Sequence, residues 1–310
     1  MIIKSPKDIN NFKRNVHLTN SARQGWELIL NTLDDSSKIL LPSYIGITER
    51  EGSGIYDPVL NTSIKHDFYL LNNDLTIDTA EIEKWIKNGK YKLILLVHYF
   101  GFKIQNIEEI VKVCKKYNII VVEDCAHLYN YNLLEFSDAG TFGDFAFYSL
   151  HKNFPFEKGG MLVQNNLEIK SPHFTTTKTT QQLATQLIKY DVKMIAEKRK
   201  KNFKTIQKLF CNIEGIESFK ELKEGDIPHN YPILVKNGLR EKLYFWLLDN
   251  NVPLIALYYC LIIPLQDEKY TSMKNISDNI LNLPVHQDII LEEIEIIIEL
   301  IKKGILELSE

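Results

Sequence analysis

Side chains that can do acid, base and nucleophilic chemistry follow three apolar segments of this sequence. YKLILLVHYFG (91–101) carries His98 and Tyr99, IIVVEDCAH (119–127) carries Asp124 and His127, and DFAFYSLHK (144–152) carries Ser149, His151 and Lys152. In open α/β sheets, ligands bind at the carboxyl ends of the strands, so we expect these groups to meet at one edge of a sheet. Together they would supply a reactive amine, a carboxylate, imidazoles and a hydroxyl.

Each of these residues also has an ordinary structural interpretation. Asp124 is typical of a residue that caps the turn after a strand. His98 and His127 fit buried structural histidines, and Lys152 by itself fits an amine on the surface. The functional interpretation rests on the coincidence of such groups at three strand ends.

The stretch NSARQG (20–25) opens a predicted helix over 21–33. The first backbone N–H groups of a helix have no partner within it, and the helix dipole favours an anion there. The backbone of Ser21, Ala22 and Arg23 is therefore a candidate phosphate cradle. The simpler alternative is that Asn20 or Ser21 only caps the helix.

The elements that would position these groups alternate between strand and helix. Apolar runs at 38–45, 91–101 and 119–127, with an amphipathic helix at 104–118, are typical of a mostly parallel sheet in an α/β protein. Strands at 144–150 and 159–166 follow. We expect a large domain over 1–195 and a small α+β domain over 196–310, the latter with strands at 231–237 and 279–289 and helices at 239–251 and 291–305.

Composition excludes several classes of protein. The 310 residues have a net charge of -3, with 45% hydrophobic and 25% charged residues, which gives no electrostatic case for nucleic acid. Cys114, Cys125, Cys211 and Cys260 form no CxxC pair, so we expect no metal site, no disulfide and a reducing compartment. No segment has the apolar length of a signal peptide core or a membrane helix, so we expect a soluble cytoplasmic protein.

Two segments match a family pattern. VVEDCAH (121–127) and GTFGDFAFYSLHKNFPFEKGGML (140–162) resemble the DegT/StrS family of nucleotide-sugar aminotransferases, which depend on pyridoxal 5'-phosphate (PLP) and have the fold type I architecture. LLPSYI (40–45), VHYFG (97–101) and ILNLPVH (280–286) agree as well. The resemblance runs from about residue 17 to the C-terminus and is strongest over 93–163.

The resemblance implies a role for each candidate residue. Lys152 corresponds to the lysine that holds PLP as an imine and shuttles the proton. Asp124 corresponds to the carboxylate that pairs with the pyridinium nitrogen, and His127 to the residue beside the ring hydroxyl. Ser149 corresponds to a phosphate ligand, together with the backbone of Ser21, Ala22 and Arg23. Lys158, directly before Gly159-Gly160, competes with Lys152 for the imine but ranks behind it.

The chain departs from the family pattern at three places, one of which is the cradle NSARQ (20–24), where relatives have Ser-Gly-Thr. Gly46 stands where relatives have the aromatic residue that stacks on the cofactor ring, and Tyr44 would replace it only if the local backbone differed. The stretch 171–200 has no counterpart of the Gly, Asn and Arg residues that reach the partner subunit's cofactor phosphate. Taken together, these departures predict a divergent branch with an altered acceptor pocket.

The implied function is transfer of an amino group to a keto sugar, nucleotide-linked, for a bacterial surface polysaccharide. The implied amino donor is glutamate, and the implied assembly is a homodimer. Two alternatives stay open. One is a PLP enzyme with another outcome, such as a dehydratase, a decarboxylase or an aminotransferase of a small phosphorylated ketone. The other is a non-catalytic homologue that acts as a binding subunit.

Overall fold

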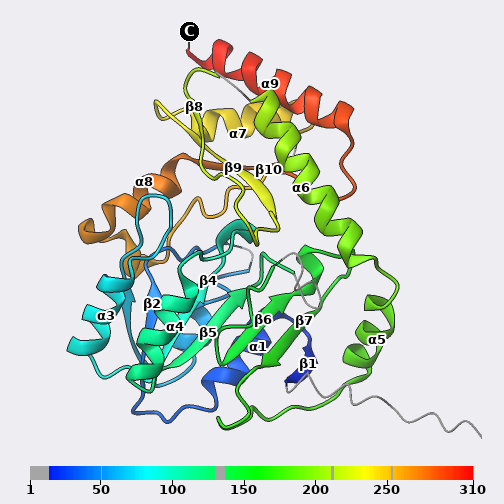
Figure 1. The fold of residues 1–310 in the computed structure, drawn as a ribbon. Coiled ribbons are helices and arrows are strands. Elements are labelled where there is room, and N and C mark those ends of the chain that lie inside the picture. Colours follow the sequence, from blue (N-terminus) through cyan, green and yellow to red (C-terminus); the bar gives the residue numbers. More distant parts are fainter. Residues whose placement is uncertain (1–13, 50, 130–136, 211–212, 253, 310) are drawn as a thin grey trace, which may run out of the picture.

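Two sheets organise the chain. The computed structural model describes residues 14–49, 51–129, 137–210, 213–252 and 254–309. Cys211 lies outside these residues, as does the N-terminal segment 1–13, where a signal peptide would stand. A seven-stranded sheet forms the lower part of Figure 1, and a three-stranded sheet lies above it. Among the described residues, no helix combines the length and apolar composition that crossing a bilayer requires.

The large sheet is mostly parallel, as the sequence predicts. Its strands, in the order β1-β7-β6-β5-β4-β2-β3, are β1 Asn15–Thr19, β7 Gly160–Gln164, β6 Phe145–Ser149, β5 Ile120–Cys125, β4 Leu93–Val97, β2 Lys38–Pro42 and β3 Lys65–Tyr69. Strands β2 to β6 run parallel, β7 is antiparallel to β6, and β1 is antiparallel to β7. Every residue of β4, β5, β6 and β7 is buried, which explains their mostly apolar sequences.

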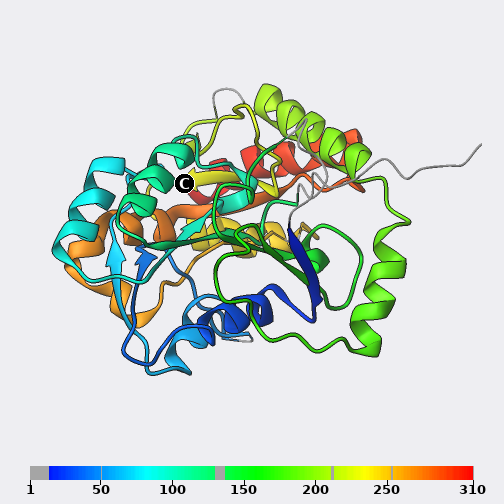
Figure 2. The same ribbon diagram turned by 60° about the horizontal axis from the view of Figure 1, so that its bottom comes forward.

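Helices cover both faces of the large sheet. Figure 2 shows α1 on one face and α3 and α4 on the other. Their bounds are α1 Ala22–Leu30, α2 Tyr56–Leu60, α3 Thr79–Asn88, α4 Ile107–Lys116 and α5 Lys178–Leu187. Capping explains where two of them begin: the Ser21 hydroxyl accepts from the Gln24 N–H at 3.1 Å, and the Asp78 carboxylate accepts from the Ala80 N–H at 2.8 Å.

The smaller sheet stands over the carboxyl ends of the parallel strands (Figure 1). It is antiparallel, with the order β10-β9-β8. Its strands are β8 Ile216–Ser218, β9 Asn230–Val235 and β10 Ile280–Pro284. The helices of this part of the chain are α6 Val192–Leu209, α7 Arg240–Asp249, α8 Thr271–Asn279 and α9 Leu291–Ser309. Helix α6 runs through the boundary predicted between 195 and 196. That boundary stays a prediction.

Gly160, the second glycine of the Gly-Gly motif, sets the contact between β7 and α1. A Cβ atom at Gly160 would lie 2.3 Å from the Ser21 carbonyl carbon, 2.5 Å from its oxygen and 2.6 Å from the Ala22 nitrogen. Because these are backbone atoms at a helix start, a side chain at 160 would have to displace the helix. The glycine therefore lets the strand approach the helix terminus that the sequence predicts as a cradle.

We expect Gly160→Ala to lower the free energy of unfolding by about 1–3 kcal/mol, because the added methyl group overlaps backbone atoms. Urea denaturation of the two proteins measures the difference. Gly54→Ala is the matched control, since a Cβ at Gly54 meets nothing within 4 Å. Equal destabilisation by both substitutions would contradict the contact described here.

Candidate functional site

A cavity of about 560 Å³ lies where the carboxyl ends of β5 and β6 meet the N-terminus of α1. The predicted site residues on its wall are Ser21, Ala22, Arg23, Asp124, Ser149 and Lys152. His151 is also on the wall. Strands that are neighbours in the sheet bring these groups together, as the sequence predicts for one sheet edge.

Lys152 is the lysine of this cavity, and Lys158 is not on its wall. Lys152 follows β6 in a short 3₁₀ helix, Leu150–Lys152, and is half-buried, whereas Lys158 is exposed. Burial lowers the pKa of the Lys152 amine, while the charges of Asp124 and Glu51 act in the opposite direction. A lowered pKa makes the neutral, nucleophilic amine more accessible.

Asp124 lies near the end of β5 and combines both of the roles considered for it. Its Oδ1 accepts from the Ala126 N–H at 2.8 Å, which is the structural turn interaction. The carboxylate also lines the cavity, and its side chain is almost fully buried. Burial raises the pKa of Asp124 to about 6, although the Ala126 N–H and the charges of Lys152 and His98 lower it.

His127, two residues after β5, is not among the residues that line the cavity, and one of its ring nitrogens has no partner among the described residues. Its Nδ1 accepts from the Phe100 N–H at 3.2 Å, so the ring hydrogen is on Nε2. This buried Nε2 has no hydrogen-bond partner among the described residues. Burial lowers the pKa of His127 well below its usual value, and Lys152 and His229 lower it further. His127 is thus a neutral donor without an acceptor, and such groups call for an explanation in a native protein.

The start of α1 leaves donors for an anion. The Ser21 hydroxyl takes the Gln24 N–H, and the N–H groups of Ala22 and Arg23 belong to the first turn, which the helix itself cannot satisfy. The Arg23 guanidinium already has a partner, since its Nη2 donates to the Glu51 carbonyl at 2.5 Å. The Ser149 hydroxyl lies on the same wall, 3.3 Å from Nδ1 of His151.

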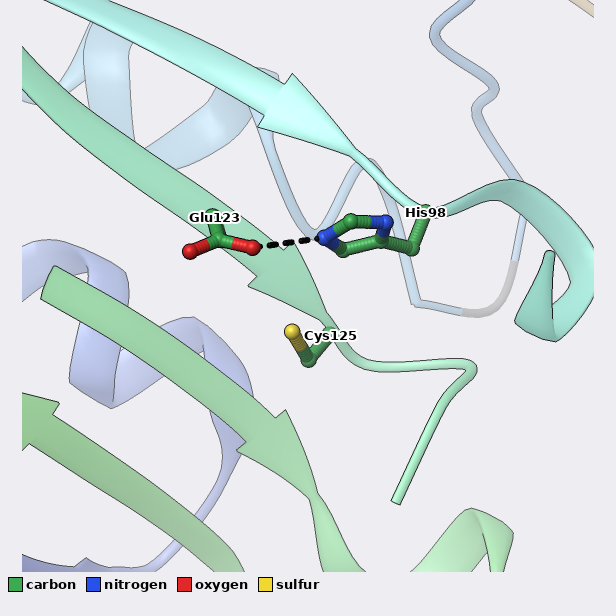
Figure 3. A group of neighbouring side chains, drawn as sticks. All are labelled: His98, Glu123 and Cys125. Atoms are coloured by element: carbon green, nitrogen blue, oxygen red, sulfur yellow. Dashed lines mark hydrogen bonds and ion pairs between the residues drawn. The ribbon is translucent and has the colours of Figure 1, made fainter. Parts of the chain in front are cut away.

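His98 and Tyr99, which follow β4, have structural roles, because both side chains make hydrogen bonds within the fold. His98 and Glu123 form a buried pair, with Nε2 of His98 2.9 Å from a Glu123 oxygen (Figure 3). The same carboxylate accepts the N–H groups of Gly140, Phe142 and Gly143 at 2.6–2.8 Å. The Tyr99 hydroxyl donates to the Tyr44 carbonyl at 2.5 Å.

The grouping of His98, Glu123 and Cys125 resembles a ligand set, because their ligand atoms lie within 4.8 Å of one another. Hydrogen bonds account for it instead. Four donors surround the Glu123 carboxylate, Nδ1 of His98 accepts from the Ile104 N–H at 3.2 Å, and burial raises the pKa of the Cys125 thiol. This cluster fixes the loop before β6 and thereby the strand that leads to Lys152.

Part of the wall comes from residues that the sequence motifs do not mark. Tyr258 and Leu257, from the segment between α7 and α8, lie on it, as does Glu51, and Gly46 lies there too. Tyr44 is fully buried and is not on the wall, so it does not replace the aromatic residue missing at Gly46. The one signal for Tyr258 in the sequence was the absence of a ring at position 46.

Comparison with known proteins identifies the class of fold. PseC of Helicobacter pylori, an aminotransferase involved in the biosynthesis of pseudoaminic acid, superimposes with a TM-score of 0.76 at 20% identity, over 94% of this chain and 87% of that one. The putative sugar aminotransferase Spr1654 of Streptococcus pneumoniae, in its PLP form, has a TM-score of 0.75 at 19% identity, over 94% and 87% of the two chains. The predicted fold type I architecture is confirmed.

One segment of the sequence matches a family model. Residues 70–182 match the model of the DegT/DnrJ/EryC1/StrS aminotransferase family. GDP-perosamine synthase of Escherichia coli O157:H7 is 34% identical over 97 residues, which are 31% of this chain and 26% of the relative. The alignment with this relative thus spans about a quarter of its length.

Asp124 generates a pH-dependent prediction for the cofactor-free protein. A folded-state pKa of about 6, above the value of 3.8 for a free aspartate, means that the carboxyl contributes stability below pH 3.8 and loses it as the pH rises through about 6. We therefore compare the free energy of unfolding of Asp124→Asn with that of the wild type. This difference should shift in favour of the variant between pH 4 and pH 8, by up to about 3 kcal/mol. Urea denaturation across this range measures it.

The matched control is Asp249→Asn, which changes an exposed carboxylate at the end of α7. It removes a carboxylate that lies outside the cavity. A pH-independent difference for Asp124→Asn, or the same pH dependence in both variants, would contradict the buried, ionisable carboxyl described here.

Proposed function

We propose that this protein is a PLP-dependent aminotransferase that acts on a sugar-like ketone. The observation that carries the proposal is the arrangement of one cavity lysine, one buried carboxylate and one unpartnered imidazole donor at the same sheet edge. The match to an aminotransferase family over residues 70–182 supports it.

The residues present fit PLP group by group. The amine of Lys152 would hold the cofactor covalently, and the carboxylate of Asp124 would pair with the protonated ring nitrogen. Nε2–H of His127, buried and without an acceptor, would donate to the ring oxygen. The first turn of α1 and the Ser149 hydroxyl would hold the phosphate, since a helix N-terminus favours an anion.

When bound, PLP supplies an electron sink for the carbon that loses a proton. The protein contributes the proton transfers and the charges. Lys152, once its amine is released, would take the proton from the substrate carbon and return it, which requires the lowered pKa found here. Asp124 would stay ionised next to the cationic ring nitrogen, because an opposite charge lowers a carboxyl pKa.

The substrate class comes from the relatives. GDP-perosamine synthase and a UDP-4-amino-4,6-dideoxy-N-acetyl-beta-L-altrosamine transaminase are among the similar proteins, and both names refer to amino sugars attached to nucleotides. We propose a nucleotide-linked keto sugar as acceptor and glutamate as donor, for the synthesis of a bacterial surface polysaccharide. A homodimer, expected for this fold type, forms part of the proposal.

We expect the purified protein with PLP to show the visible absorbance of a lysine-bound cofactor, and Lys152→Ala to lack it, because the amine that forms the bond is gone. Lys158→Ala is the matched control and should keep the band, since Lys158 is exposed and not on the cavity wall. Loss of the band in Lys158→Ala with retention in Lys152→Ala would reverse the assignment.

Glutamate should convert the bound cofactor to its amino form. Mixing the PLP-loaded protein with excess glutamate is expected to replace the visible band by the near-ultraviolet band of pyridoxamine phosphate, and added 2-oxoglutarate should restore it. Absorbance spectroscopy follows both steps. A protein that binds PLP through Lys152 but shows no change with glutamate would not be a glutamate-dependent transaminase.

A further inference from the structure

The ring of Tyr258 occupies the space into which a side chain at position 46 would project. A Cβ atom built on Gly46 would lie 2.0 Å from Cγ, 2.2 Å from Cβ and 2.2 Å from Cδ1 of Tyr258. Real Cβ atoms do not approach a ring so closely, so residue 46 is limited to glycine while the tyrosine stays in place. The absence of a side chain at position 46 therefore makes room for the ring of Tyr258.

Tyr258 reaches this position because two distant segments pair there. The Ile47 N–H donates to the Cys260 carbonyl and the Ile262 N–H donates to the Ile45 carbonyl, both at 3.0 Å. Gly46 and Leu261 form an antiparallel bridge between these bonds. The segment 260–262 of the C-terminal part is thus fixed against 45–47 of the large sheet region.

Hydrogen bonds also fix Tyr258 itself. Its N–H donates to the hydroxyl of Tyr44 at 2.9 Å, and its carbonyl accepts from the hydroxyl of Ser277 at 2.6 Å. The Tyr44 hydroxyl in turn donates to the Leu257 carbonyl at 3.2 Å. Tyr44, which the sequence offers as a substitute stacking ring, holds the backbone of Tyr258. The tyrosine is therefore positioned before any ligand binds.

Tyr258 also lies among the groups proposed to bind the cofactor. It shares the cavity wall with Asp124, Ala126 and Lys152. Its ring centroid is 6.4 Å from that of His127, with 28° between the planes. Burial raises the pKa of the Tyr258 hydroxyl, and the Asp124 carboxylate raises it further. The ring is thus close to the residues proposed for the pyridine nitrogen and the ring oxygen.

The other benzene ring on this wall is not available for such a contact. Phe147 is 2% exposed, and its ring packs against Trp26 at 5.9 Å between centroids. Tyr258 is half-buried, so part of its surface faces the cavity. A flat heteroaromatic ring gains from contact with an aromatic face beyond the apolar area that it buries.

We propose that Tyr258 supplies the aromatic contact to the PLP ring in this chain, and that Gly46 is the residue that makes room for it. The proposal rests on the proposed function, since it requires that PLP binds in this cavity. It assigns the contact to the C-terminal segment, so closure of that segment against 45–47 completes the cofactor site.

The test measures the affinity of the cofactor-free protein for PLP by absorbance titration, with induced circular dichroism as a second readout. Tyr258→Leu is expected to bind PLP about tenfold or more weakly, because it keeps apolar bulk and loses the ring. Tyr258→Phe keeps the ring and should bind within about threefold of the wild type. Tyr259→Leu is the matched control, because Tyr259 is 43% exposed and not on the cavity wall.

A double-mutant cycle tests the link to Gly46. Gly46→Ala should weaken PLP binding in the wild type, because the methyl group displaces the Tyr258 ring. In a Tyr258→Ala background the same change should cause no further loss, and Gly46→Phe should restore affinity by supplying a ring from the other segment. Additive losses from the two sites would overturn the proposed link.

Failures of the two proposals can be told apart. If the wild type takes up no PLP, the proposed function fails and the assignment of Tyr258 fails with it. If the wild type binds PLP and Tyr258→Leu binds equally well, only the assignment fails. Equal losses in Tyr258→Phe and Tyr258→Leu would also overturn it, because the hydroxyl and not the ring would then matter.

Thermal denaturation of each cofactor-free variant establishes that the comparison is between folded proteins, and the Gly46→Phe rescue remains informative if Tyr258→Leu fails to fold.

Discussion

Burial of an amine and a carboxyl in one cavity is the constraint on which the rest of this structure depends. Burial shifts the pKa of Lys152 downward and that of Asp124 upward, so each is moved toward its neutral form. Neither shift favours stability by itself, since an isolated chain would solvate both groups in water. The surrounding fold must hold them there. Glu123 contributes to this, because its buried carboxylate accepts hydrogen bonds from His98 and from the loop that leads into β6.

Much of this could be predicted from the sequence because the parallel sheet leaves strong signals. Buried parallel strands are rich in apolar residues, so β4, β5 and β6 stand out, and their carboxyl ends must lie at one edge. Asp124 and Lys152 are therefore expected together without reference to any relative. Strands β1 and β3 were missed because NVHLT and KHDFY are short and largely polar, and each pairs with one neighbour at an edge of the sheet.

The sequence does not reveal contacts that two remote segments make jointly. Tyr44 and Tyr258 are far apart in the chain, and nothing in YYCLII indicates which tyrosine faces a cavity. His98 shows the opposite difficulty, because its place at a strand end suits a functional residue, while its two ring nitrogens are both engaged by the framework. In such cases only the partners of each atom decide between a structural and a functional role.

Placing the aromatic ring at Tyr258 and not at position 46 makes the cavity wall depend on a segment from the C-terminal part of the chain. A ring projecting from position 46 would belong to the large sheet region alone, so that region would supply the aromatic contact by itself. With the ring on Tyr258, the wall is complete only when segment 260–262 pairs with 45–47 and Tyr44 binds the backbone at 257–258. Cofactor binding would then stabilise this pairing, because a ligand stabilises the state that binds it. If Tyr258 contacts the cofactor as proposed, position 46 determines how strongly the C-terminal segment is coupled to cofactor binding.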